Sequence, residues 1–172
     1  MDRTDSGNEE LADSARREDI PASLFTLREL LDSTGLPYAF LPNARPLRSA
    51  QEGASFFGIE IAQTAPALVA RSEAGFHLVI VSGARGKVDF GALAPLFGVR
   101  SLGLAKPVEV ERQTGARPGS VPLVVPKLPC VVDEGLFSWK RIYGGSGHPG
   151  WTLCVHPKVL DAANNVVSHF RV

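Results

Sequence analysis

Two glycine-rich segments contain the residues best suited to chemistry. One spans residues 114–122 (TGARPGSVP) and the other spans residues 144–150 (GGSGHPG). Because glycine has no Cβ, such a backbone can approach a ligand closely, and its N–H groups can bind a phosphate or polarise a carbonyl group. Glycine and proline also form ordinary tight turns. The two segments therefore predict either the walls of a ligand pocket or a pair of structural turns.

The other motifs in the sequence give weaker evidence for a functional site. Residues 83–87 (GARGK) resemble the end of a phosphate-binding loop, but the first glycine is too close, and a valine replaces the Ser or Thr that would hold magnesium. The histidines lack the spacing of metal ligands, so we expect no metal and no cofactor. No Gly-x-Ser-x-Gly motif is present, and neither Cys130 nor Cys154 has a neighbouring base, so a covalent nucleophile is unsupported.

The elements that position these loops are short helices and strands. Ser49 and Glu52 form a capping box for a helix that ends at Gly58. Further helices are predicted at residues 21–34, 90–97, 107–114 and 157–163. Strands are predicted at residues 36–41, 67–71, 76–82, 100–104, 130–133, 140–143, 151–156 and 166–172. This interleaving indicates an α+β fold, with a mixed, mainly antiparallel sheet or a partly closed barrel carrying surface helices.

The formal net charge of zero divides unevenly along the 172 residues. Residues 1–20 hold seven acids and three bases, a net charge of −4, so residues 21–172 carry a net charge of +4. The first segment is poor in apolar residues, and we expect a flexible acidic tail ahead of a single domain at residues 21–172. No apolar run is long enough to span a membrane, and two cysteines suit a reducing compartment, so we expect a cytoplasmic protein without a membrane partner. The basic body is compatible with a polyanionic partner.

The order of the motifs resembles that of the YbaK-type aminoacyl-tRNA deacylases, a family that includes the editing insertion of bacterial prolyl-tRNA synthetases. The resemblance runs from about Ser49 to Val167, about 70% of the chain. It is carried by residues 49–58 (SAQEGASFFG), Gln63-Thr64 with the strand at 67–71, Val88-Asp89, residues 104–107 (LAKP), residues 114–121, residues 132–134 (VDE), and residues 142–157 (IYGGSGHPGWTLCVHP).

The resemblance implies hydrolysis of the ester that joins a wrong, small amino acid to the terminal adenosine of a tRNA. In such enzymes the glycine loops wall the pocket, backbone N–H groups stabilise the oxyanion, and the substrate itself helps to position the attacking water. The implied partners are the tRNA acceptor end and, transiently, an aminoacyl-tRNA synthetase, and we expect a monomer. Carried over to this chain, the implied catalytic residues are Gln63, Gly119 and Ser120, and the implied substrate-binding residues are Thr64, Val121, Asp133, Gly145, Ser146, Gly147 and His148.

Position 63 departs from the family pattern, which usually has a catalytic lysine directly before the threonine. Gln63 brings no positive charge, and a charge-assisted hydrogen bond is roughly twice as strong as a neutral one. Loss of a positioned electrostatic donor typically costs about 2–4 kcal/mol in the barrier. Either a neighbouring base such as Arg45, Arg85 or Lys106 substitutes, or the chemistry is weak or absent.

Three functions therefore remain open at this stage. The first is a trans-editing deacylase. The second is a weakened or inactive binding module of the same fold that holds an aminoacyl-adenosine, a nucleotide or an amino-acid-like ligand. The third is a partner-binding domain with a vestigial pocket.

Overall fold

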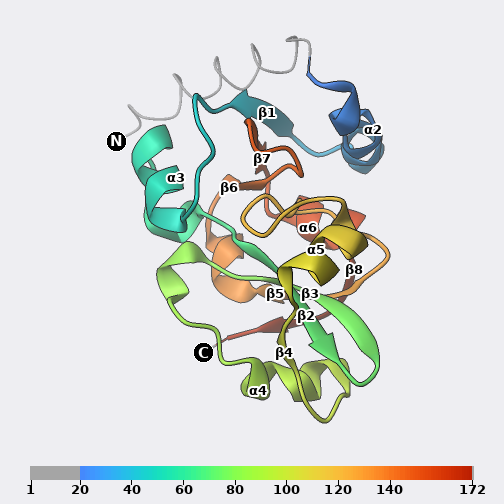
Figure 1. The fold of residues 1–172 in the computed structure, drawn as a ribbon. Coiled ribbons are helices and arrows are strands. Elements are labelled where there is room, and N and C mark those ends of the chain that lie inside the picture. The colour runs from blue at the N-terminus through green and yellow to red at the C-terminus, as the bar shows by residue number, and fades with distance from the viewer. Residues whose placement is uncertain (1–19, 172) are drawn as a thin grey trace.

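The computed structural model describes residues 20–171 and places eight strands in two sheets (Figure 1). The three-stranded sheet has the order β1 (Tyr38–Pro42), β7 (Trp151–Val155), β6 (Ile142–Gly145), and its neighbours are antiparallel. The acidic segment at residues 1–20 lies outside the described residues except for its last residue.

The five-stranded sheet has the order β4 (Gly103–Leu104), β2 (Ala67–Ser72), β3 (Gly75–Ile80), β5 (Pro129–Asp133), β8 (Asn165–Phe170). The β4–β2 and β2–β3 pairs are antiparallel, whereas the β3–β5 and β5–β8 pairs are parallel. The α+β class with mixed pairing is confirmed, and the strands divide between two sheets, which form no closed barrel within residues 20–171.

Five α-helices surround these sheets in the described part of the chain: α2 (Phe25–Thr34), α3 (Ala50–Phe57), α4 (Phe90–Leu93), α5 (Pro107–Thr114) and α6 (Lys158–Ala163). Short 3₁₀ helices lie at Ala22–Leu24, Ile61–Gln63, Gly83–Arg85, Ala94–Phe97 and Glu134–Ser138. No helix in residues 20–171 is both long enough and apolar enough to cross a membrane.

Strand β3 shows why the larger sheet is a rigid base. Leu78 and Ile80 pack into the main core, whereas Val79 and Val81 pack into a second cluster on the opposite face of the sheet. Successive side chains of a strand point to opposite faces, so an uninterrupted apolar run is what a strand buried on both faces requires. The segments that leave this sheet toward the pocket therefore start from fixed positions.

The second glycine segment does not begin where the sequence suggests. A strand is predicted at residues 140–143, but β6 runs over Ile142–Gly145, so Gly144 and Gly145 are strand residues paired with Leu153 and Thr152. Turn chemistry predicts a loop at paired glycines, but the contacts described below require glycine inside this strand.

Candidate functional site

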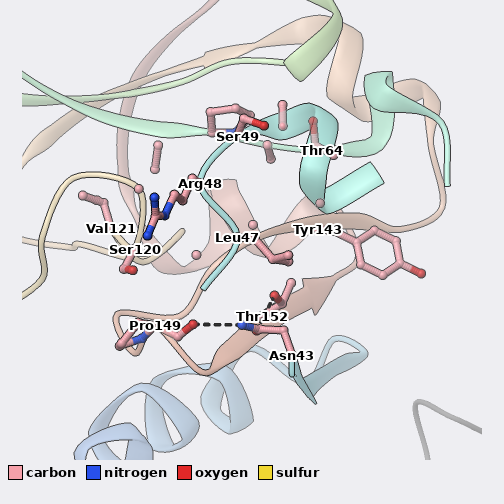
Figure 2. Close-up of a pocket in the computed structure, with 18 of the residues that line it drawn as sticks. Asn43, Leu47, Arg48, Ser49, Thr64, Ser120, Val121, Tyr143, Pro149 and Thr152 are labelled. Carbon is pink, nitrogen blue, oxygen red and sulfur yellow. Dashed lines mark hydrogen bonds between the residues drawn. The ribbon is translucent and has the colours of Figure 1, made fainter. Parts of the chain in front are cut away.

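A pocket of about 320 Å³ opens between α3, the start of β2 and the two glycine segments (Figure 2). This volume lies at the lower end of the range for small-molecule sites. Its walls include six of the residues predicted from the sequence: Thr64, Gly119, Ser120, Val121, Gly145 and His148. Residues more than 50 positions apart in the chain thus meet around one cavity.

The two glycine segments meet because Gly145 has no side chain. A Cβ at Gly145 would overlap the carbonyl oxygen of Val121 and lie 2.8 Å from its carbonyl carbon. Two backbone hydrogen bonds join the segments, from Leu123 N–H to Gly145 O (3.0 Å) and from Gly147 N–H to Ser120 O (2.8 Å). Close backbone approach is therefore the reason for glycine at position 145.

The loop at residues 118–121 supplies the backbone donors of the pocket. Gly119 has φ +91°, a left-handed conformation that favours glycine, and the N–H of Ser120 donates to Arg117 O at 3.0 Å. The N–H groups of Gly119 and Val121 donate to no other described residue. Backbone N–H groups without a partner, in a loop that lines a pocket, suit a phosphate or a developing oxyanion.

Asn43 holds two segments together at the rim of the pocket. Its side-chain amide donates to Arg45 O (2.7 Å) and Pro149 O (2.8 Å), and its oxygen accepts the Thr152 hydroxyl proton (3.0 Å). Asn43 is 9% exposed, so these bonds satisfy a polar group that burial would otherwise penalise. The Asn43 side chain thereby joins the loop before α3 to the second glycine segment.

One face of α3 forms a further wall. Ser49, Ala50, Gly53 and Phe57 all line the pocket, and Phe57 packs on Tyr143 of β6 with ring centroids 5.5 Å apart. The helix begins at the predicted cap, because Ser49 Oγ accepts the N–H of Glu52 at 3.1 Å, and Gly58 ends it at φ +63°. A Cβ at Gly53 would meet nothing within 4 Å, so no packing contact requires glycine there.

Thr64 reaches the pocket from the segment between the two sheets. Its hydroxyl donates to Ile61 O (2.7 Å), and its backbone pairs with Tyr143 in an isolated bridge. Behind it, the N–H of Gly83 donates to Thr64 O (2.9 Å), and a Cβ at Gly83 would overlap Thr64 Oγ1. The segment at residues 83–87 therefore begins with a 3₁₀ turn, Gly83–Arg85, that supports the pocket wall.

His148 and Ser146 have different roles in the second glycine segment. Nδ1 of His148 accepts the N–H of Gly150 at 2.9 Å, so in the neutral ring the proton resides on Nε2. Ser146 does not line the pocket; its hydroxyl donates to Trp151 O (2.7 Å) and accepts the N–H of His148 (3.1 Å). Gly147 likewise lies outside the lining.

Gln63 does not line the pocket. Its Oε1 accepts the N–H of Glu60 (3.2 Å), and its Nε2 donates to Arg141 O (3.4 Å), just before β6, so both ends of the amide are already used. The segment that follows lines the pocket with Thr64, Ala65 and Pro66. Neither a lysine nor a glutamine side chain enters the pocket from this segment.

Asp133 also lies outside the lining, although the resemblance implies a substrate contact. It is fully buried and forms a two-point ion pair with Arg85, from Nε to Oδ2 (2.5 Å) and from Nη2 to Oδ1 (2.7 Å). Burial alone would raise its pKa, but the bonds from Arg85 and from the N–H groups of Ser82 and Gly135 hold the pKa below its usual value. This carboxylate anchors the 3₁₀ turn behind Thr64.

The charges in the pocket are few. Arg48 is the one Lys or Arg among the described lining residues, and no Asp or Glu is among them. Burial raises the pKa of the Tyr143 phenol, which is consequently neutral at ordinary pH. Within residues 20–171 no cluster of His, Cys, Asp and Glu could hold a metal ion. The pocket can therefore stabilise negative charge through backbone N–H groups and one guanidinium.

The lining also includes residues that the sequence does not predict as site residues, among them Asn43, Arg48 and Gly53. The capping box that places α3 was recognised, and helical spacing from Ser49 would have put Gly53 and Phe57 on the same face. Nothing local pointed to Asn43, because its partner Pro149 is 106 residues away.

The cavity is lined in part by glycine backbone, with one guanidinium and no carboxylate among the described lining residues, and this chemistry suits a small anionic or ester-containing ligand. The comparisons identify the family. The model of the aminoacyl-tRNA editing domain matches residues 44–162, and the chain belongs to this family. No curated protein matches the chain significantly.

Three solved structures share the fold over nearly their whole length. The crystal structure of a proposed trans-editing enzyme for prolyl-tRNA synthetase is 30% identical, with a TM-score of 0.73 over 87% of this chain and 96% of that one. The hypothetical protein APE2540 is 29% identical, with a TM-score of 0.75 over 83% and 96%. A scaffold from computational epitope grafting is 26% identical, with a TM-score of 0.74 over 89% and 97%.

Proposed function

We propose that this protein is a trans-editing deacylase that hydrolyses the ester of a tRNA mischarged with a small amino acid. The observation that carries the proposal is the junction of the two glycine segments in a member of the editing family. Gly119 and Val121 line the pocket there, and their N–H groups have no partner among the described residues. The similarity to a proposed trans-editing enzyme supports the same reaction.

In the proposed reaction the terminal adenosine and the aminoacyl group occupy the pocket. The N–H groups of Gly119 and Val121 donate to the carbonyl oxygen as negative charge develops on it, and removal of one such donor typically costs about 10²–10³ in rate. His148 presents its Nε2 proton to the substrate as a donor. No carboxylate of the described lining is available as a general base, so the rate depends on electrostatic stabilisation of the transition state rather than on proton transfer to a carboxylate. The water oxygen bonds to the carbonyl carbon, the ester C–O bond breaks, and the departing ribose oxygen takes up the proton that the water loses.

The binding-module alternative is favoured by one observation, the absence of a lysine among the described lining residues. The two functions differ in turnover. The deacylase releases free amino acid from mischarged tRNA under multiple-turnover conditions, whereas the binding module retains the aminoacyl-tRNA without accelerating hydrolysis.

Gln63→Lys tests whether a positive charge at position 63 can stabilise the transition state. Because Gln63 lies outside the pocket lining and is held by Glu60 and Arg141, we expect the deacylation rate to stay within about two-fold of the wild-type rate. A gain of about 10²-fold or more, the size of a positioned electrostatic donor, would show that a lysine at this position reaches the substrate and that the native chain has lost catalytic power.

A further inference from the structure

Arg48 is the one cationic side chain among the described lining residues that a substrate could contact. It lines the cavity, and Figure 2 shows its guanidinium pointing toward the loop that carries Ser120 and Val121. The guanidinium forms no ion pair or hydrogen bond with any described residue, and no Asp or Glu is among the described lining residues. A cation without a partner in the described part of the chain, beside such a lining, is suited to an anionic group of a ligand.

The backbone of Arg48 is fixed even though its side chain is exposed. Its N–H donates to Glu52 Oε2 at 2.9 Å, and Ser49 Oγ accepts the N–H of Glu52, so the capping box of α3 holds Arg48 from one side. On the other side, Asn43 holds the root of the loop through its bonds to Arg45 O and Pro149 O. The guanidinium therefore starts from a constrained position at the mouth of the pocket.

The other bases considered as substitutes for the missing lysine are placed differently. Arg85 is paired with buried Asp133. Arg45 lies in the same loop as Arg48 and is exposed, but it does not line the pocket, and neither does Lys106. Arg45 and Arg48 thus carry the same charge, but of the two only Arg48 lines the pocket.

We propose that Arg48 binds the phosphate of the substrate's terminal nucleotide, and this inference rests on the proposed deacylase function. A guanidinium matches the geometry of two phosphate oxygens and remains charged at every relevant pH. Its exposed position at the mouth suits a group that stays outside the cavity, whereas the ester lies against the N–H groups of Gly119 and Val121. Because the phosphate charge is the same in substrate and transition state, the contact contributes to binding and leaves the chemical step unchanged.

The direct test is equilibrium binding of adenosine and of adenosine 5′-methylphosphate, a nucleotide with one negative charge. We expect the wild type to bind the phosphate-bearing probe about 10-fold more tightly than adenosine, a difference of about 1.4 kcal/mol. Arg48→Gln should abolish this difference, and Arg48→Lys should restore part of it. Arg45→Gln is the matched control, three residues away in the same loop, and should bind both probes as the wild type does.

A second readout uses mischarged tRNA. Arg48→Gln should raise KM about 10-fold with kcat within two-fold of the wild type. A plot of log affinity against log salt concentration should also become less steep, by about the one unit of slope that one phosphate contact contributes. Equal binding of both probes by an active wild type would overturn the role of Arg48 and leave the deacylase intact. A fall in kcat with unchanged KM would also overturn it. A wild type that binds neither probe and deacylates no tRNA would refute the proposed function, and the role of Arg48 with it.

Discussion

Gly145→Ala is the substitution that most sharply tests how the pocket is built. A Cβ at this position would lie 2.8 Å from the Val121 carbonyl carbon and 3.1 Å from that of Ser120, where an ordinary contact begins at 3.4 Å. The segments would have to separate by at least 0.6 Å to relieve the closest of these two contacts. They would have to separate by about 1.4 Å to bring the overlapped Val121 oxygen to the same 3.4 Å limit.

Such a movement stretches both hydrogen bonds between the segments, Leu123 N–H to Gly145 O and Gly147 N–H to Ser120 O. Each bond contributes about 0.5–1.5 kcal/mol, and overpacking adds about 1–3 kcal/mol. We therefore expect a loss of about 2–6 kcal/mol in the free energy of unfolding. A displacement of about 1 Å in the donors at Gly119 and Val121 would lower kcat/KM by about 10²-fold.

Urea unfolding and deacylation of mischarged tRNA measure the two effects separately. Gly103→Ala in β4 is the matched control, because a Cβ there meets nothing within 4 Å and Gly103 has no positive φ. The control should change neither the unfolding midpoint nor the rate appreciably. If Gly145→Ala kept the wild-type midpoint and a rate within two-fold, the glycine segments would not be held together in the way described.

Three further substitutions test other parts of the site. Asp133→Ala should destabilise the fold by about 3–5 kcal/mol, because it leaves Arg85 unpaired in a largely buried pair. Glu134→Gln, at the next residue, removes only the charge that pairs with exposed Arg171 and should matter little. The pKa of Asp133 is lowered in the folded state, so the ionised carboxylate stabilises the fold above about pH 4. This stabilisation is lost on further acidification. Unfolding measurements should therefore show an acid-dependent loss of stability in the wild type but not in Asp133→Ala. Gly53→Ala should raise the free energy of unfolding by about 0.5–1 kcal/mol through helix propensity. It should also lower kcat/KM, most for the larger aminoacyl groups. Equal effects on all substrates would show that Gly53 does not limit the size of the aminoacyl group. Asn43→Ala should cost about 2–3 kcal/mol by leaving buried polar groups unpaired, and an unchanged unfolding midpoint would contradict its fastening role.

Local signals allowed much of the fold to be predicted. The cap at Ser49 and the stop at Gly58 depend on bonds within a few residues, and the structure contains both. The hairpin between β2 and β3 likewise follows from apolar runs on either side of a short turn. These elements were predictable because the interactions that define them are short in sequence.

The site was predictable only in part, because its remaining determinants are contacts between distant segments. Gly145 resembles a turn residue, but its conformation follows from the approach of Val121. Asp133 was assigned to substrate by resemblance, and its geometry is set by Arg85, 48 residues away. The position of Arg48 at the mouth depends on Asn43 and its bond to Pro149. Pairings of this kind leave no local pattern in a single sequence.

The most direct test of the account is the rate of amino acid release from tRNAs mischarged with small amino acids, measured with the full chain under multiple turnover. The account predicts that at least one such tRNA is deacylated faster than its uncatalysed rate by about 10²-fold or more, the contribution of a positioned oxyanion donor, and that Gly145→Ala removes most of this acceleration. Release at the uncatalysed rate from every mischarged tRNA would contradict the deacylase. If those tRNAs were nevertheless bound, the pocket would be that of a binding module.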